Sequence, residues 1–330
     1  MKKYNQPRIA VLGGGTGLST MLRGLKARTP HITAIVTVTD DGGGSGILRR
    51  ELGMLPPGDI RNCILALASR EPLMQEVLNY RFHEGSLSGQ NLGNLFLAAL
   101  NDMTGSFDRA VSLMGQVLSI TGQVLPVTNE DLVLQAEFSD GTVIRGETHI
   151  TDYKKKTDAI IHRISLDPAL PSALPSVLEA IEEADMIILG PGSLYTSVIP
   201  NLLVKGVADT IRAFQGVKVY VMNVMTQDGE TENYSAADHV RALLDHGGDG
   251  LFQYVLANNR PIPEELLTAY RLENAVPVPA NADALRALGV EPVYVPVAYW
   301  RDRLIRHDPA ALADSLMKLY YANAATRTAE

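Results

Sequence analysis

Four glycines among five positions, directly after an apolar run near the N-terminus, limit what this chain can fold into. The apolar run is Ile9–Leu12, and a helical apolar pattern continues to Lys26; between them lie Gly13, Gly14, Gly15, Thr16 and Gly17. This order predicts a strand, a tight turn and a helix. Glycine permits positive φ and lets an anion approach the backbone without meeting a Cβ. Because the N–H groups at a helix start attract that anion, the turn predicts a phosphate-binding site for a nucleotide.

The turn matches neither of two common nucleotide fingerprints. Leu18 occupies the third glycine position of G-x-G-x-x-G, which weakens the case for a nicotinamide-dependent oxidoreductase. The glycines are also not followed by the Gly-Lys-Ser/Thr of a P-loop. The alternative is a tight turn that holds no ligand, but its place in a strand–helix–strand unit favours a ligand.

A second glycine-rich loop follows the next predicted strand, Ile32–Thr39. It begins with Asp40 and Asp41 and continues with Gly42, Gly43, Gly44, Ser45 and Gly46. An acid at the end of the second strand can reach ribose hydroxyls, and two acids could hold a hydrated Mg²⁺ that bridges to phosphate oxygens. Asp40 and Asp41 are therefore candidate catalytic residues, with Asp41 as the candidate metal ligand. The alternative is a polar strand end or a helix cap.

Pro56-Pro57-Gly58 then breaks the chain before another helix. Asp59 is predicted to cap this helix, which carries Arg61 and Asn62 in its first turn. An arginine at a helix start opposes the helix dipole unless it meets an anion there. Arg61 is therefore a candidate phosphate ligand, and the alternative is a salt bridge to Glu51 or Asp59.

Two later turns and one loop complete the candidate site. Asn91 and Asn94 precede or begin an apolar helix, where asparagine is either a cap or a ligand contact. After the predicted strand Met186–Leu189, another turn offers backbone groups and hydroxyls as donors, through Gly190, Pro191, Gly192, Ser193 and Thr196. The polar loop after the predicted strand 217–222 adds Asn223 and Gln227.

Charge and cysteine content bound the function. The net charge of −8 and the absence of any basic run longer than Lys154–Lys156 argue against general nucleic-acid binding. We expect no membrane span and no signal peptide. The single cysteine, Cys63, lies in an apolar helical run and is expected to be a packed core thiol. The seven histidines have no paired spacing, so a zinc site is not expected. These features predict a cytoplasmic protein.

The apolar period changes to two between residues 117 and 150. We therefore expect a small antiparallel β insertion at about 117–165, with strands at 124–128, 132–138 and 143–150 and a polar loop at 153–157. Alternating helices and strands follow, including short strands at 276–278 and 293–297 and a last helix at 310–321. The pattern predicts one α/β domain over residues 1–330, with a Rossmann-like, doubly wound, mostly parallel sheet.

Six motifs in this order make the chain similar to one known family. They are Gly13–Gly17, Asp40–Gly43, Pro57–Asn62, Leu92–Leu95, Gly190–Ser197 and Asn223–Thr231. Together they resemble the YvcK-type branch of the CofD-like superfamily, the gluconeogenesis factors. The resemblance covers nearly the whole chain. It implies a Rossmann-like core with its ligand across the carboxyl ends of the strands.

The resemblance implies two functions. CofD enzymes move a phospholactyl group from a guanosine diphosphate donor to a deazaflavin precursor with Mg²⁺. The YvcK-type branch is associated with cell shape and cell-wall synthesis during gluconeogenic growth, and it binds UDP-sugars, notably UDP-N-acetylglucosamine. This chain departs from the branch's usual pattern at two places: Gly44 replaces a serine, and Gln90-Asn91 replaces His-Ser.

Two hypotheses follow. In the first, the chain is a UDP-sugar-binding protein that acts on regulators of wall synthesis. Gly13–Gly17 and Ser45-Gly46 would then hold the diphosphate, and Arg61 would neutralise charge. In the second, the chain is a transferase in which Asp40 or Asp41 places Mg²⁺ on the diphosphate and Arg61 stabilises the leaving phosphate. We also expect a homo-oligomer, with the β insertion as the candidate interface.

Overall fold

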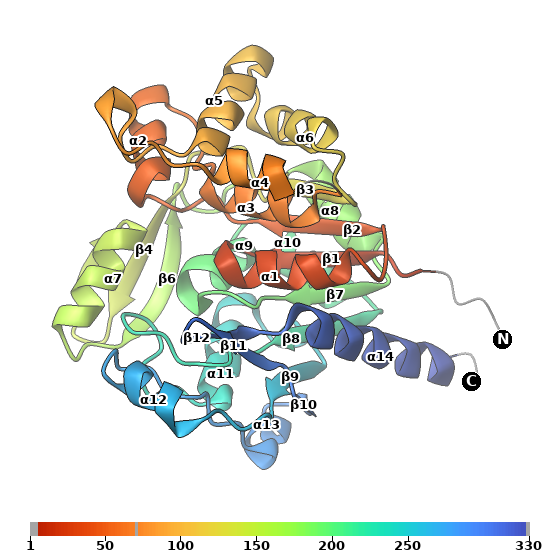
Figure 1. Ribbon diagram of the computed structural model, residues 1–330. Helices are drawn as coiled ribbons and strands as arrows, with labels where there is room; N and C mark the ends of the chain where they lie inside the picture. The colour runs from red at the N-terminus through yellow and green to blue at the C-terminus, as the bar shows by residue number, and fades with distance from the viewer. Residues whose placement is uncertain (1–5, 70–71, 328–330) are drawn as a thin grey trace.

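A sheet of seven parallel strands forms the centre of the computed structural model, which describes residues 6–69 and 72–327 (Figure 1). The strand order is β10-β9-β8-β7-β1-β2-β3, and every neighbouring pair is parallel. The chain thus starts in the middle, builds one half and returns to build the other, as a doubly wound sheet does. The strands are β1 (Ile9–Gly13), β2 (Ile32–Val36), β3 (Gln123–Pro126), β7 (Met186–Leu189), β8 (Val217–Val221), β9 (Tyr254–Asn258) and β10 (Glu291–Val295).

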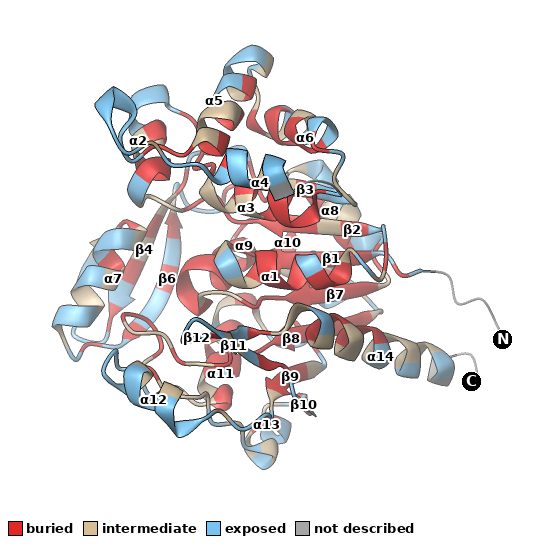
Figure 2. Ribbon diagram, in the orientation of Figure 1, coloured by how far each residue is buried: buried red, intermediate tan, exposed pale blue. Residues whose placement is uncertain are grey.

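The central strands are apolar because helices cover both faces of the sheet. Every residue of β1, β7 and β8 is buried (Figure 2). Helix α1 (Gly15–Leu25) packs between α3 (Gly58–Leu67) and the C-terminal α14 (Pro309–Arg327). α14 approaches closely, since a Cβ on Gly24 would lie 1.8 Å from the Pro309 carbonyl oxygen. The opposite face carries helices of the second half, α8 (Pro175–Glu182), α9 (Ile199–Leu202), α10 (Val207–Ala213) and α11 (Ala236–Gly247).

The segment between β2 and β3 is helical and projects beyond the sheet (Figure 1). It consists of α2 (Gly43–Leu52), α3, α4 (Pro72–Asn79), the 3₁₀ turn η1 (Gly85–Leu87), α5 (Leu92–Thr104) and α6 (Phe107–Val117). The glycine-rich segment 42–46 is therefore a helix start and not only a loop. The predicted strand 32–39 was too long, since β2 ends at Val36, where its partner β3 also ends.

A separate three-stranded antiparallel sheet forms the β insertion. It contains β4 (Val133–Phe138), β5 (Val143–Arg145) and β6 (Ile161–Asp167), with α7 (Glu147–Lys156) between β5 and β6. Two predictions here were wrong. Residues 124–128 do not join the insertion, because β3 pairs in parallel with β2. The strand at 143–150 stops at Arg145, and α7 includes most of the predicted polar loop at 153–157.

The C-terminal third adds α12 (Glu264–Arg271), α13 (Ala282–Ala287) and a hairpin of β11 (Ala298–Arg301) and β12 (Leu304–His307). Residues 276–278 contribute one isolated bridge, Met225 to Pro277, in place of the predicted strand. The strand expected at 293–297 is β10, which begins two residues earlier. Within the described ranges, no helix has the length and apolar content that a membrane crossing requires.

Candidate functional site

The two glycine turns meet where the strand order reverses. β1 and β7 are neighbours in the sheet, and their carboxyl ends lead into the turns at 13–17 and 190–193. A Cβ on Gly17 would lie 2.7 Å from the Pro191 carbonyl oxygen, and one on Gly192 would lie 3.1 Å from the Gly14 carbonyl oxygen. These glycines therefore let two backbone turns pack against each other. From the sequence alone, we attributed Gly17 and Gly192 only to the binding of an anion, not to the packing of one turn on the other.

Asp59 joins this site from α3. Its carboxylate accepts a hydrogen bond from the Gly15 N–H, and a Cβ on Gly14 would lie 2.7 Å from its Oδ2 atom. The prediction that Asp59 caps α3 was wrong. The cap position is Pro57, and the described residues provide no side-chain cap for this helix.

The turns form one wall of a cleft of about 530 Å³. Eleven residues that the sequence predicted line it: Gly14, Gly15, Thr16, Gly17, Asp40, Asp59, Pro191, Gly192, Ser193, Asn223 and Gln227. Four further residues with polar side chains come from α7, α12 and the β11–β12 hairpin: Glu147, Tyr270, Arg306 and His307. These four belong to no motif, and they reach the cleft only through the packing of distant segments.

The N-terminus of α1 is available to an anion. Its cap position is Gly14, which has no side chain, and in the described chain no acid lies in its first turn. Among its N–H groups, that of Gly15 donates to the Asp59 carboxylate. Gly15 has φ of +67°, which favours glycine, and a Cβ there would meet nothing closer than 4.0 Å. The other N–H groups of this turn can therefore donate to a phosphate oxygen.

Side chains of the loop after β8 fix the second turn. The Asn223 amide accepts from the Gly192 N–H (3.2 Å) and donates to the Gly192 carbonyl oxygen (2.8 Å), and the Ser193 hydroxyl donates to Gln227 Oε1 (2.8 Å). Thr196 is not among the cleft-lining residues, although its neighbour Ser197 is. The Thr196 hydroxyl and the N–H groups of Leu194 and Tyr195, at the start of the π-helical segment η2 (Leu194–Val198), lie near the carboxylate of Glu230, whose pKa burial raises to about 7.

Three carboxylates line the cleft, and their environment disfavours the charged form. Burial, with the neighbouring Asp40 charge, raises the pKa of Asp59 to about 6. Burial also raises the pKa of Asp40, and burial with the nearby carboxylates raises the pKa of Glu147 well above its usual value. Arg306 is the single lysine or arginine among the described lining residues. The cleft thus combines anion-binding turns with acids that a cation would stabilise.

Mg²⁺ fits this arrangement as an ion shared with a ligand. The described residues contain no group of three His, Cys, Asp or Glu side chains that could hold a metal alone. Mg²⁺ needs only one or two carboxylates when phosphate oxygens and water complete its shell, and Asp40 and Asp59 can supply them. Asp41 is not among the cleft-lining residues, and its Oδ1 atom accepts from the N–H (3.0 Å) and hydroxyl (2.7 Å) of Thr148.

Four other predicted residues, Arg61, Asn62, Asn91 and Asn94, form a second cluster. Arg61 donates from Nη1 to Asn94 Oδ1 (2.9 Å) and from Nη2 to Asn62 Oδ1 (2.7 Å). Within the described ranges it has no ion pair with Glu51 or Asp59. Asn91 caps α5, since its side chain accepts from the Asn94 N–H. Gly42, Gly43, Ser45 and Gly46 begin α2 and do not line the cleft, and Gly13 and Gly190 lie at strand ends behind it.

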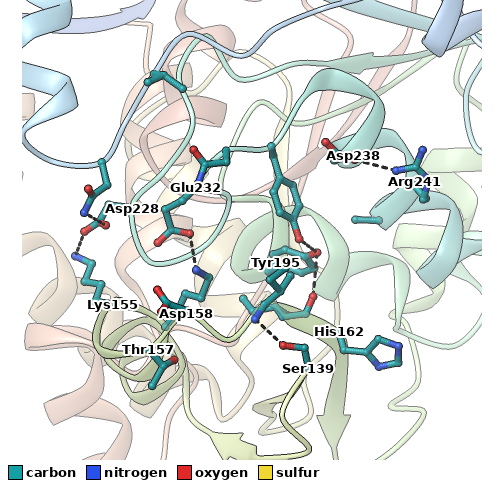
Figure 3. Close-up of a pocket in the computed structure, with 18 of the residues that line it drawn as sticks. Ser139, Lys155, Thr157, Asp158, His162, Tyr195, Asp228, Glu232, Asp238 and Arg241 are labelled. Atoms are coloured by element: carbon teal, nitrogen blue, oxygen red, sulfur yellow. Dashed lines mark hydrogen bonds and ion pairs between the residues drawn. The ribbon is translucent and has the colours of Figure 1, made fainter.

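A larger cavity, of about 1040 Å³, lies between the β insertion and α11 (Figure 3). Ion pairs join Lys155 to Asp228 and Arg241 to Asp238 along its walls. Tyr195 points into it, whereas its neighbours Ser193 and Ser197 line the glycine cleft. The segment η2 and the loop after β8 therefore separate the two spaces.

The family follows from comparison with known proteins. A family model described as "2-phospho-L-lactate transferase CofD" matches residues 9–298. The chain belongs to the CofD family. A relative from Thermoanaerobacterium thermosulfurigenes is 51% identical, covering 96% of this chain and 97% of its own length. The protein of Bacillus subtilis named "Gluconeogenesis factor" is 47% identical, covering 95% and 98%.

A relative of this chain has a crystal structure with the same fold. A crystal structure of a Bacillus halodurans protein matches with a TM-score of 0.91 and 44% identity, covering 95% of this chain and all of that one. The α/β class, the central parallel sheet and the small antiparallel sheet predicted from the sequence are confirmed. The resemblance to the gluconeogenesis-factor branch is confirmed as well.

Proposed function

We propose that this chain binds a UDP-sugar, with UDP-N-acetylglucosamine as the expected ligand, in the glycine cleft. The observation that carries the proposal is that two glycine turns and the N-terminus of α1 line one cleft. Peptide N–H groups at such a helix start bind phosphate without further charge. The diphosphate would lie against the turns at 13–17 and 190–193, at the topological switch point where such sheets bind nucleotides.

Lining residues from α12 and the hairpin would contact the base or the sugar. Tyr270 offers an aromatic ring, and its hydroxyl accepts from the Ile305 N–H (2.8 Å), which holds α12 against the hairpin. Arg306 is exposed and lies on the same hairpin. An arginine here can donate to a phosphate or a carbonyl oxygen of the ligand. The biological role we propose is that of the gluconeogenesis factors: control of cell-wall synthesis and cell shape during gluconeogenic growth. The protein would act in the cytoplasm, as a homo-oligomer, on regulatory partners.

Calorimetric titration with UDP-N-acetylglucosamine tests the binding proposal. The variant Arg306→Gln should weaken binding about tenfold, because it removes a charge-assisted contact. Arg303→Gln is the matched control, since Arg303 is exposed at the turn of the same hairpin and does not line the cleft. The proposal is refuted if millimolar ligand produces no heat of binding and no thermal stabilisation.

A second candidate function, transfer from a nucleotide diphospho-donor, is favoured by the carboxylates. An acceptor hydroxyl would attack the distal phosphorus, and the bond from that phosphorus to the bridging oxygen would break to release a nucleoside monophosphate. Asp59, with its pKa near 6, is mostly ionised at neutral pH and can take the hydroxyl proton. Mg²⁺, when held by Asp40, would neutralise charge on the diphosphate.

Release of nucleoside monophosphate from such a donor, in the presence of Mg²⁺ and an acceptor alcohol, tests the transferase. Asp40→Asn should abolish the release, because Asp40 lines the cleft. Asp41→Asn should retain most of it, because Asp41 faces Thr148 in the insertion. Equal loss in both variants would contradict the assignment of Asp40.

A further inference from the structure

One buried side chain connects the two glycine turns. Asn201 lies in α9 and is 0% exposed. Its Nδ2 group donates to the Gly13 carbonyl oxygen (3.2 Å), where β1 leads into the first turn, and to the Ser197 carbonyl oxygen (2.8 Å), in η2 after the second turn. Because both partners are carbonyl oxygens, only the NH₂ end of the amide can face them. Asn201 therefore joins two segments that lie far apart in the sequence.

Ser197 lies where the two turns meet. A Cβ on Gly14 would be 3.3 Å from the Ser197 Cβ atom, and one on Gly192 would be 3.4 Å from it. Ser197 also lines the glycine cleft. Its N–H donates to the Ser193 carbonyl oxygen (2.9 Å), and its carbonyl oxygen accepts from Asn201. A shift of Ser197 would therefore displace the turns that pack against it.

Side chains supply hydrogen bonds that fix η2 on the sheet. The Ser193 carbonyl oxygen accepts from the Val198 N–H (3.0 Å), five residues later, which is the π-helical spacing. Pro200 has no N–H to continue the helical pattern. The Thr196 carbonyl oxygen, four residues before it, accepts instead from the hydroxyl of Thr39 (3.4 Å), just beyond β2. The main chain of η2 thus depends on Thr39 and Asn201 for its position.

The amide of Asn201 is only partly used. Its Oδ1 atom has no hydrogen-bond partner among the described residues, and a buried polar atom without a partner costs free energy. The Gly13 carbonyl oxygen also accepts from the Thr37 N–H (3.1 Å), so it would remain paired without Asn201. The stabilising effect of Asn201 on the fold is therefore partly offset. What its two bonds specifically fix is the position of the second turn relative to the first.

We propose that Asn201 is a positioning residue of the glycine cleft, which holds the two turns at the separation that a diphosphate requires. This inference rests on the proposed function of the cleft. A diphosphate that contacts both turns needs N–H donors at a fixed distance from each other. Asn201 is buried and is not among the cleft-lining residues, so it acts through the turns and not by contact with the ligand.

The variant Asn201→Leu tests the proposal, because it keeps the approximate shape and removes both donors. Its affinity for UDP-N-acetylglucosamine, measured by calorimetry, should fall about three- to tenfold. Without ligand, hydrogen exchange should become faster in peptides that cover residues 13–17 and 190–198. Thr29→Val is the matched control: it removes another buried bond to a main-chain oxygen, from Thr29 Oγ1 to Pro7 (2.8 Å), outside the cleft. It should change neither the affinity nor the exchange of the turns.

Asn201→Asp is the second variant. It has the same shape as the wild type, but its side chain donates only when it is protonated. Because burial raises the pKa of a carboxyl group, its affinity relative to the wild type should recover as pH falls from 8 towards 6. A residue that only fills space would not produce this pH dependence.

Several results would overturn the proposal. They are unchanged exchange in either turn of Asn201→Leu, faster exchange throughout the chain, wild-type affinity in both variants, and failure of both variants to fold. In the second and last cases Asn201 would support only the fold. If the wild type does not bind UDP-N-acetylglucosamine, the proposed function fails, whereas faster exchange confined to the two turns still supports the positioning role of Asn201.

Discussion

Replacing Asp59 by asparagine should make the protein more stable at neutral pH. The carboxylate lies against the first glycine turn, where burial and Asp40 raise its pKa from 3.8 to about 6. An acid whose pKa is raised on folding binds its proton more tightly in the folded state. Folding stability therefore falls as pH rises from about 4 to about 6, and the full cost is present above pH 7.

The size of the effect follows from the two pKa values. The difference between 3.8 and about 6 corresponds to about 3 kcal/mol, at about 1.36 kcal/mol per pH unit. Unfolding entropy for a chain of this length is about 0.7 kcal/mol/K. Asp59→Asn should therefore raise Tm by about 4 °C at pH 7.5 relative to the wild type. At pH 4 the two proteins should be nearly equal, because Asp59 is then protonated in the folded state.

Thermal unfolding followed by circular dichroism between pH 4 and 8 checks this prediction. The control variant is Asp102→Asn, which changes an exposed acid on α5 and should shift Tm by less than about 1 °C. A constant offset between Asp59→Asn and the wild type across this pH range would refute the linkage argument. Mg²⁺ together with UDP should reduce the difference at pH 7.5, if the ion neutralises Asp59.

Three further predictions concern the turns and the hairpin. Gly17→Ala should destabilise the fold by about 1–3 kcal/mol and weaken nucleotide binding, because its Cβ would lie 2.7 Å from the Pro191 oxygen. Denaturant titrations measure the loss of stability. The control is Gly13→Ala, whose Cβ would have ordinary contacts of 3.7 Å or more. Burial lowers the pKa of His307 to about 4, and its Nε2 donates to the Met222 oxygen. Stability from neutral His307 should therefore be lost as pH falls from 6.5 towards 4, by about 3 kcal/mol, and a His307→Gln variant should lack this slope in urea unfolding. The single tryptophan, Trp300, stacks on Arg260 (4.6 Å) and pairs with Ile305 in the hairpin, so UDP-sugar binding should change its fluorescence; an unchanged spectrum at saturation would show that the hairpin does not take part.

The sequence predicted the turn residues that line the cleft because each turn follows a buried strand. Gly14, Gly15, Gly192 and Asp40 lie at the carboxyl ends of parallel strands, and such ends share one edge of a sheet. Asn223 was predicted for the same reason, although it acts by holding the second turn. Local pattern and strand direction were sufficient here.

Other residues depend on packing that no local pattern encodes. Glu147 reaches the cleft because residues 147–156 form a helix, and this polar segment has Ile150 as its one buried residue. Arg306 arrives on a hairpin whose short strands resemble ordinary loop sequence. Arg61 was assigned to the diphosphate because the sequence shows that it starts a helix, but not which space that helix start faces. Three glycines between 43 and 46 concealed α2, since glycine is a poor helix former.

The place of β1 in the sheet also determines when the cleft can form during synthesis. β1 pairs on one side with β2, which is made soon afterwards, but on the other side Ile9 pairs with Met186. One edge of β1 therefore stays open until more than half of the chain has been made, and open strand edges are prone to aggregation. α14 covers α1 only at the very end, and Arg306 also comes late. Ligand binding can thus stabilise the finished protein but cannot assist its nascent N-terminal half, which must be protected by other means.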